Sequence, residues 1–385
     1  MGPPKVPVII GIGEVKNSSR QKEDAIEPLD LMLNAINISA HDASSSFPEK
    51  LIACVDSVGV VASSTWRYKD LPGLVSEKLG IRPSHRAYSA LAGSSSVELI
   101  DNTARLVAKG EAEVGIIVGG EAMASLKTYI KTHSYPPPWT APDPETNEIY
   151  YANDTDALTG IGKIHKVGVP MHVYPMYENG RRAHKGQRPI ENFRESASLY
   201  GRYAKVASEH PTSWHFGRGT ETAETIGTIS KRNRMICFPF WNRSNFSSSA
   251  AIAFALDECL NSSGLCKEDI DMFDFYSCFP VVPKLACDHL GIPCDNPRKP
   301  ITLLGGLTSF GGAGANYSMH VRAEFLESVT NIEAVTDIEI RLQAVVEMTR
   351  RLRKLQNCHE ASNGLVLANG GGTNYGKCNM PLYTS

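Results

Sequence analysis

Apolar and polar positions follow two different periods along the N-terminal third of the chain. The short apolar run Val6–Ile12 predicts a strand, and apolar positions at helical spacing predict a helix near Glu27–Ala40. Further short apolar runs and amphipathic segments follow in turn. Strands that alternate with helices are typical of a layered α/β domain.

The clearest pattern lies between residues 90 and 120. A loop of small residues, 90–96, leads into a helix, because apolar side chains repeat there at helical spacing: Val97, Ile100, Ala104 and Val107. Gly110 stands where a helix C-cap belongs, and Ser95 with Glu98 fits a capping box at the helix start. A buried strand, Glu113–Val118, follows and ends in two glycines.

The same order of elements recurs near the C-terminus. A glycine-rich loop that begins near Leu303 runs into a helix, and residues 362–372 predict a buried strand that again ends in glycines. Two copies of loop, helix, strand and glycine turn indicate a duplicated α/β unit. We therefore expect an N-terminal half, residues 1–250, and a C-terminal half, residues 251–385.

The region between the two copies, about residues 125–235, has a different character. It is rich in Pro, Tyr, His and Arg, and only Ile190–Ala207 sustains a helical period. We expect an inserted loop domain that covers one face. The charge-rich segment 324–354 is expected to be a solvated helix.

Composition narrows the class of protein. The chain has 385 residues, and 39 Lys and Arg against 41 Asp and Glu leave a formal charge of −2. This balance lacks the basic footprint of a nucleic-acid or anionic-membrane binder. No apolar run approaches the roughly 18 residues of a spanning helix, and the N-terminus lacks the apolar core of a signal peptide, so we expect a cytoplasmic protein.

Cofactor and metal signatures are sparse. The nine cysteines include no C-x-x-C pair and are expected to be reduced thiols, and the histidines show no ligand spacing, which predicts no metal. The sequence contains no P-loop and no complete dinucleotide fingerprint. We therefore expect no bound cofactor.

Several motifs occur in one order along nearly the whole chain. They are EPLDLM from Glu27, GEAEVGIIVGGEAM from Gly110, YPMYENGRR from Tyr174, FYSCFP from Phe275, GGLTSFGGAGANY from Gly305 and LANGGG from Leu367. With them the chain resembles the thiolase superfamily, and more narrowly the thiolase-like proteins often named acetyl-CoA acetyltransferases. The resemblance implies a five-layer αβαβα fold, a homodimer formed through the N-terminal half, and an acyl-CoA or other thioester substrate.

The resemblance also locates departures from the family pattern. The loop that carries the family's nucleophilic cysteine contains Ser94, Ser95 and Ser96 here, and the loop that carries its activating histidine contains Gly311, Gly312 and Ala313. The family's last cysteine corresponds to Ala368 or Asn369, and its Asn-Glu or His-Asp pair to Tyr276 and Ser277. A mechanism through an acyl-cysteine at the family position therefore does not apply.

The leading hypothesis is an enzyme that makes or breaks a carbon–carbon bond beside a carbonyl, by aldol, retro-aldol or Claisen-type cyclisation, without an acyl-enzyme. Tyr276 would be the acid/base group and Tyr317 its partner, while loop amides near Ser94–Ser96 and the side chain of Asn369 would stabilise an enolate oxygen. Thiolase relatives without the cysteine that act as steroid side-chain aldolases also use tyrosines. A polyketide-like acyl substrate in specialised biosynthesis would fit.

Two alternatives stay open. In the first, the chain is an acyltransferase whose nucleophile is Cys278 or one of the serines Ser94, Ser95 and Ser96. In the second, catalysis is lost and the chain serves as a binding or partner subunit. Each candidate also has an ordinary structural explanation: serines as helix caps, Cys278 as a buried apolar residue, and the tyrosines as packing residues.

Further residues are candidates for substrate binding. His172 and Tyr174 belong to the expected roof of the site, and the others lie on the glycine-rich loops: Gly311, Gly312, Asn316, Gly370 and Gly371. The basic residues of the insertion are either a contact for a CoA phosphate or solvated surface: Lys163, Lys166, Arg181, Arg182 and Lys185.

Overall fold

A computed structural model describes the chain over residues 7–91, 95–143, 164, 170–226, 246–263, 265–270, 272–311 and 314–321. The chain divides into two compact units. Unit 1 comprises Met1–Ile149 with Ala313–Arg353, and unit 2 comprises Tyr150–Gly312 with Lys354–Ser385. These units group residues by spatial contact, whereas the halves expected above follow a repeat in the sequence, so the boundary at residue 250 stays a prediction.

Unit 1 is built around a parallel sheet of three described strands in the order β2-β1-β3. The strands are β1 (Ser57–Val60), β2 (His85–Tyr88) and β3 (Gly115–Val118), and Ser57 of β1 aligns with His85 on one side and Gly115 on the other. The four residues of β1 are all buried, as expected for a central strand.

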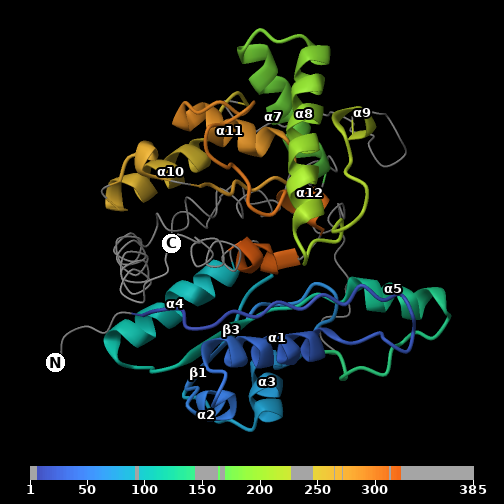
Figure 1. The fold of residues 1–385 in the computed structure, drawn as a ribbon, viewed down its shortest axis with the longest axis vertical. Helices are drawn as coiled ribbons and strands as arrows, with labels where there is room; N and C mark the ends of the chain where they lie inside the picture. Colours follow the sequence, from blue (N-terminus) through green and yellow to red (C-terminus); the bar gives the residue numbers. More distant parts are fainter. Residues whose placement is uncertain are drawn as a thin grey trace. The chain divides into compact units, whose positions relative to one another are not determined.

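Helices cover both faces of this sheet (Figure 1). Helices α1 (Pro28–Ala43) and α3 (Leu71–Leu79) pack on one face, and α4 (Ser95–Lys109) packs on the other. Alternation along β1 explains this, because Val58 and Val60 join the core with α1 and α3, while Gly59 faces Leu99 of α4. A Cβ on Gly115 would lie 2.2 Å from Thr103 Cγ2, so the glycine permits the close approach of α4. Unit 1 also contains α2 (Pro48–Ala53), α5 (Met123–Lys131) and the short helix η2 (Gly314–Asn316).

Unit 2 is mainly helical over its described residues. Its long helices are α7 (Pro170–His184), α8 (Pro189–Glu209), α10 (Ala250–Ser263) and α11 (Val281–Leu290), and its short ones are α9 (Ala223–Ile226), η1 (Lys267–Asp269) and α12 (Gly306–Phe310). An extended segment, residues 272–277, runs through the core, where Phe273 N–H donates to Pro300 O at 2.8 Å and Phe275 N–H to Ile301 O at 3.1 Å. Tyr200, Leu256 and Leu285 are among the buried residues around it.

Several predicted elements are confirmed. The helix near Glu27–Ala40 is α1, the helix after the small-residue loop is α4, the strand near Glu113–Val118 is β3, and the period over Ile190–Ala207 belongs to α8. Gly110 ends α4 with a left-handed φ of 74°. The predicted helix 324–354, the predicted strand at 362–372, and residues Gly312, Asn369, Gly370 and Gly371 lie outside the described residues.

The predicted strand Val6–Ile12 is wrong over its described part, residues 7–12, which form no strand. This segment runs along α1 instead. Ile12 N–H donates to Asp42 Oδ2 at 2.8 Å, and a Cβ on Gly13 would lie 2.2 Å from Ala35 O. The backbone therefore packs directly on the helix. Its N–H group at Ile12, which a strand would pair with a neighbouring strand, is satisfied by the Asp42 carboxylate instead.

The expectation that residues 125–235 hold a single sustained period is also wrong, because α7 forms there as well. The capping box at Ser95 is not formed either, since Ser95 is already helical and its Oγ donates to Ala90 O at 2.6 Å. The glycine-rich segment after Leu303 is not one continuous loop, because α12 and η2 interrupt it before the helical residues 317–321. No described helix is long and apolar enough to cross a membrane.

Candidate functional site

Three residues that the sequence analysis nominated meet in unit 2. Tyr174 comes from α7, and Tyr276 and Cys278 come from the extended segment and the turn before α11. Both phenols are about 6% exposed, and both side chains lie close enough to Cys278 to lower the pKa of its thiol. The ring of Tyr174 also stacks on Phe279, with centroids 4.6 Å apart. We call Tyr174, Tyr276 and Cys278 the phenol–thiol cluster.

The local fold explains why Tyr276 and Cys278 share a side. In an extended chain alternate side chains point the same way, so Ser277 points to the other side. There Ser277 is fully buried without a hydrogen-bond partner for its Oγ, and a Cβ on Gly306 would lie 2.3 Å from that atom. The hydroxyl of Tyr200 donates to Ser277 O at 2.6 Å and ties the segment to α8.

The electrostatics of the cluster keep the Cys278 thiol protonated. Burial raises the pKa of Cys278 to about 12, although hydrogen bonds from Tyr174, Tyr276 and the backbone N–H of Phe279 act in the opposite direction. A thiol is a good nucleophile only as a thiolate. The cluster therefore offers two phenol donors and a neutral thiol rather than an activated cysteine.

A buried lysine is hydrogen-bonded to the helix that carries Tyr174. Lys284 of α11 is 0% exposed, and its Nζ donates to Glu178 Oε1 at 2.7 Å, Ser196 Oγ at 2.7 Å and Asn192 Oδ1 at 3.2 Å. These partners lie on α7 and α8, and Glu178 is one turn from Tyr174. Sequence analysis missed Lys284, because a lysine within an apolar helix gives no sign that it will be fully buried.

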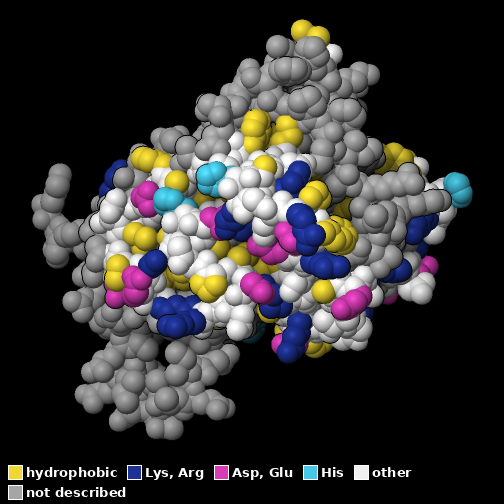
Figure 2. Space-filling view, turned by 90° about the horizontal axis from the view of Figure 1, so that it is seen from above, with side chains coloured by type: hydrophobic (Ala, Val, Ile, Leu, Met, Phe, Trp, Pro, Cys, Tyr) yellow, Lys and Arg dark blue, Asp and Glu magenta, His cyan; other side chains and the backbone are white. Residues whose placement is uncertain are grey.

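The basic residues of the insertion are largely neutralised within unit 2. Arg181 is 2% exposed, and its guanidinium pairs with Asp288 at 2.6 Å and with Glu195 at 3.3 Å. Lys185 also pairs with Asp288. The suggestion that Arg181 lies on the surface, whether to meet a phosphate or as solvated charge, is therefore wrong, and Lys163 and Lys166 lie outside the described residues. On the face in Figure 2, described basic side chains lie beside acidic ones rather than in one basic patch.

The glycine-rich loop of unit 2 is covered by a tryptophan. Gly311 has a φ of 112°, and a Cβ there would lie 2.2 Å from Trp214 Cδ1. Trp214 N–H donates to Phe310 O at 2.7 Å, and the His215 ring hydrogen-bonds Ser309 O. A substrate-binding role for Gly311 stays a prediction, and Trp214 joins it as a neighbour that the sequence did not suggest.

Unit 1 gathers a second set of nominated residues. Ser95 and Ser96 at the start of α4 are both fully buried, and Ser96 Oγ has no hydrogen-bond partner. Helix η2 packs on α4 through Ala315 and Leu99. Next to Ala315, the buried Asn316 has no partner for Oδ1, which lies 1.8 Å from where a Cβ on Gly119 would be.

Tyr317, 3% exposed, follows Asn316 directly. Ser94 and the side chain of His172 lie outside the described part of the chain. The roles predicted for all these residues stay predictions.

Glu121, which sequence analysis did not single out, organises the ends of β1 and β3. Its carboxylate accepts hydrogen bonds from the backbone N–H of Ser64 at 2.7 Å and of Thr65 at 2.8 Å, and from the hydroxyls of Ser63, Ser64 and Thr65. A Cβ on Gly314 would lie 2.5 Å from Glu121 Oε1. The sequence could have suggested this role of Glu121, because it is an acidic residue directly after the Gly119-Gly120 turn.

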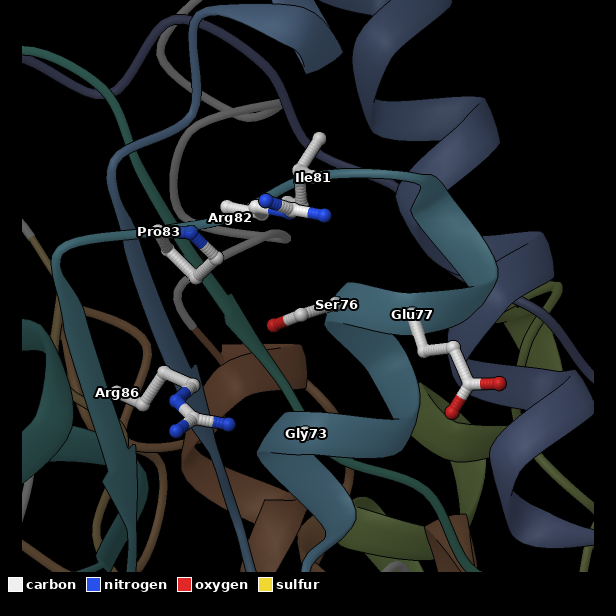
Figure 3. Close-up of a pocket in the computed structure, with 7 residues that line it drawn as sticks. All are labelled: Gly73, Ser76, Glu77, Ile81, Arg82, Pro83 and Arg86. Carbon is white, nitrogen blue, oxygen red and sulfur yellow. The ribbon is translucent and has the colours of Figure 1, made fainter.

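A surface hollow of about 410 Å³ also occurs in unit 1 (Figure 3). It lies between α3 and the chain leading into β2, and its lining residues are Gly73, Ser76, Glu77, Ile81, Arg82, Pro83 and Arg86. Ser76 Oγ donates to Pro72 O, and Arg86 pairs with Asp70 at 3.5 Å. None of the nominated residues lines this hollow.

Comparisons with known proteins identify the fold. No protein-family model matches the chain, and no curated protein sequence matches it. Solved structures do match, among them a monomeric SCP2-thiolase like protein type 1 from Mycobacterium smegmatis, with a TM-score of 0.64 and 23% identity over 86% of this chain and 73% of that one.

Two further structures agree. The Ltp2-ChsH2(DUF35) aldolase has a TM-score of 0.55 at 17% identity and covers 83% of this chain and 89% of that one. The dimeric peroxisomal thiolase of Saccharomyces cerevisiae has a TM-score of 0.52 at 16% identity and covers 82% and 88%. The chain thus has a thiolase-like α/β fold, as its sequence motifs predicted.

Proposed function

We propose that this chain is an enzyme that makes or breaks a carbon–carbon bond beside a carbonyl, with Tyr276 as its acid/base group and without an acyl-enzyme. The observation that carries the proposal is the phenol–thiol cluster, in which two buried phenols meet at a thiol whose pKa is raised to about 12. Acyl thioesters are the proposed substrates, because the fold is thiolase-like.

The phenols are proposed to transfer a proton and to donate a hydrogen bond. In the aldol direction Tyr276, as its phenolate, takes the α-proton of the donor thioester to form the enolate, and it then gives that proton to the carbonyl oxygen of the acceptor as the new bond forms. In the cleavage direction the same two proton transfers run in reverse. Tyr174 donates a hydrogen bond to the acceptor oxygen or to the enolate oxygen. The roles predicted from the sequence for Ser94–Ser96, Asn369 and Tyr317 stay predictions. No metal or bound cofactor is part of this proposal.

The names of the similar structures cover both reaction classes, since they include thiolases as well as an aldolase. One of the structurally similar proteins is titled an aldolase, and its likeness extends over 83% of this chain. The serines of unit 1 offer little nucleophilic character, because Ser95 Oγ is committed to Ala90 O and Ser96 is fully buried.

A second candidate, acyl transfer through Cys278, is favoured by one observation. The side chains of Tyr174 and Tyr276 and the backbone N–H groups of Cys278 and Phe279, in the turn before α11, all act to lower the pKa of Cys278, and such donors stabilise a thiolate. Burial outweighs these donors, since it raises the pKa of Cys278 to about 12. This candidate therefore ranks below the acid/base reaction.

Hydrogen exchange beside the carbonyl separates the two candidates without knowledge of the partner substrate. A panel of acyl-CoA thioesters is incubated in D2O with the wild-type protein and with Tyr276→Phe, Tyr174→Phe and Tyr177→Phe variants. Deuterium at the α-carbon is measured by mass spectrometry, and the intact protein mass is recorded. Tyr177 is the matched control, because it is a buried tyrosine one turn from Tyr174 that packs against Phe246.

We expect exchange in the wild type and no acyl adduct. Tyr276→Phe should lower the exchange rate about a hundredfold or more, the usual contribution of a general acid or base, and Tyr177→Phe should not. An acyl adduct on Cys278 would move the conclusion to acyl transfer. A wild-type protein with neither exchange nor adduct would contradict both and favour a binding subunit.

A further inference from the structure

A buried ion pair lies one helical turn from Tyr174. The Tyr174 ring of α7 stacks on Phe279, which lies just before α11, with centroids 4.6 Å apart. One turn further along each helix, Lys284 Nζ of α11 donates to Glu178 Oε1 of α7 at 2.7 Å. The Lys284 side chain is 0% exposed and the Glu178 side chain 12%, so solvent screens this contact little. The two helices are therefore joined at two successive turns.

The Lys284 ammonium is fixed in its direction by three acceptors. Besides Glu178, they are Ser196 Oγ at 2.7 Å and Asn192 Oδ1 at 3.2 Å, both on α8. An ammonium has three protons, so these bonds use every donor. Ser196 Oγ also lies within hydrogen-bond distance of Glu178 Oε1, at 3.1 Å. The Glu178 carboxylate is therefore held between α11 and α8.

The turn of α7 that carries Tyr174 depends on such side-chain contacts. Pro175 lies inside α7 and has no backbone N–H, so this turn lacks one of the hydrogen bonds that hold a helix to itself. Side chains four residues apart lie on one face of a helix, so a contact at Glu178 holds the face that presents Tyr174. Buried ion pairs often add little stability compared with apolar residues of similar size, but they are directional and can select one register between two helices.

We propose that Lys284 is a positioning residue, which through Glu178 sets where α7 holds Tyr174 against Phe279. This role rests on the proposed function, in which Tyr174 donates a hydrogen bond to a substrate oxygen. Lys284 itself is fully buried with its three donors used, so it acts only through Tyr174. A misplacement of about 1 Å in a group that contacts the reacting atoms can lower a rate about a hundredfold.

The test removes the contact without leaving a buried charge unpaired. The double variant Lys284→Met with Glu178→Gln replaces both charges by neutral side chains of similar length, and circular dichroism checks its fold. Glu178→Ala is a second variant, because Lys284 there keeps Glu195 as a counter-charge at 3.6 Å. Lys185→Ala is the control, since it removes a cation that is 40% exposed and leaves Lys284 in place.

Two readouts report on Tyr174. The first is deuterium exchange at the α-carbon of acyl-CoA thioesters, measured for each variant with and without Tyr174→Phe. The second needs no substrate: in protein labelled with 3-fluorotyrosine, the ¹⁹F resonance of Tyr174 is assigned by its loss in Tyr174→Phe. Its chemical shift reports the surroundings of the ring.

We expect the folded double variant and Glu178→Ala to shift the Tyr174 resonance and to slow exchange about tenfold or more. In the Tyr174→Phe background the same changes should slow exchange by less than about twofold, because the hydroxyl that they displace is already absent. Lys185→Ala should change neither readout. The positioning role is overturned if the resonance stays unchanged in the folded variants, or if exchange slows equally in both backgrounds.

Failure of the proposed function is distinguishable from failure of the positioning role. A wild-type protein without exchange would contradict the proposed function, and the ¹⁹F resonance would then decide alone. A shifted resonance in the folded variants would support the link between Lys284 and Tyr174, and an unchanged one would overturn it.

Discussion

Cys278 is subject to opposing effects at the scale of a single side chain. Burial raises its pKa to about 12, against hydrogen bonds from Tyr174 and Tyr276. At about pH 8 a thiol of ordinary pKa, about 8.5, is roughly a quarter thiolate, whereas a thiol with a pKa of about 12 is ionised to only about one part in ten thousand. The thiolate fraction therefore differs by about three orders of magnitude.

We accordingly predict that iodoacetamide labels Cys278 at least a hundredfold more slowly than the exposed Cys54 in the folded protein at about pH 8. The measurement is the time course of each alkylated peptide by mass spectrometry, and unfolding in urea should make the two rates similar. Removal of one phenol donor, in Tyr174→Phe, should slow Cys278 further. Rapid labelling of Cys278 in the native state would restore it as a nucleophile and weaken the acid/base proposal.

At the scale of elements, three helices of unit 2 are joined by buried ion pairs. Lys284 of α11 pairs with Glu178 of α7, and the Arg181 guanidinium pairs with Asp288 and Glu195. We predict that Lys284→Ala destabilises the protein by about 3–5 kcal/mol, because it leaves Glu178, whose side chain is only 12% exposed, without its counter-charge. Lys185→Ala is the control, since Lys185 is 40% exposed and should cost no more than about 1 kcal/mol. Urea unfolding followed by circular dichroism measures both, and equal losses would contradict the prediction.

The same pairs predict a dependence of stability on pH. Burial acts to raise the pKa of Asp288 and of Glu195, but the adjacent Arg181, with Lys185 and Lys284, lowers both below their ordinary values. A carboxyl whose folded pKa is lowered stabilises the protein fully above its unfolded value, about 4 for these groups, and loses that contribution as the pH falls through the folded value. Urea midpoints should therefore be level above about pH 5 and fall below about pH 4.

The contact between residues 11–13 and α1 gives a second element-scale prediction. A Cβ on Gly13 would lie 2.2 Å from Ala35 O and 2.6 Å from Ser39 N, both backbone atoms of a helix. Gly13→Ala should therefore cost about 1–3 kcal/mol, because the segment must move away from α1. Gly219→Ala is the matched control, since nothing lies within 4 Å of its added Cβ, and it should change stability by less than about 0.5 kcal/mol. Thermal unfolding of the two variants decides, and an unchanged Gly13→Ala would show that the segment is not packed on the helix.

These elements also show how far sequence reasoning extends. Helix α4 was predictable because its apolar period and Gly110 are local signals, whereas the run at residues 7–12 needed knowledge of its neighbour, since an apolar segment can lie on a helix as well as in a sheet. Helix α7 was missed because Pro175 lies inside it and its polar residues blur the period.

The site was predictable in its residue types but not in its assembly. The sequence suggests Tyr174 and Tyr276 separately, and only the packing of α7 against α11 brings both side chains near Cys278. The burial of Lys284 depends on Glu178 and Ser196, which are 106 and 88 residues away in the sequence, so no local pattern could reveal it.

At the scale of the whole molecule, the edge of the unit 1 sheet bears on assembly. Strand β2 pairs with β1 on one side and has no partner among the described residues on the other. The N–H groups of His85 and Ser89 donate to carbonyls on the β1 side of β2. Successive residues of a strand direct their N–H groups to opposite sides, so the Tyr88 N–H points away from β1. The Tyr88 side chain is 40% exposed. An exposed strand edge is a ready site for pairing with another chain.

The homodimer implied by the sequence motifs would use this edge, and we propose it as the dimer contact. Of the similar structures, one is titled monomeric and another dimeric, so measurement has to decide. We predict that light scattering after size exclusion gives twice the mass of the chain for the wild type and the mass of one chain for Tyr88→Pro, because proline removes the outward N–H. The control is Tyr88→Phe, which keeps the N–H and should stay dimeric. Glu77→Pro is not a suitable control, because it would break α3. A wild-type protein with the mass of one chain would leave β2 as a free edge and remove the N-terminal contact from the proposal.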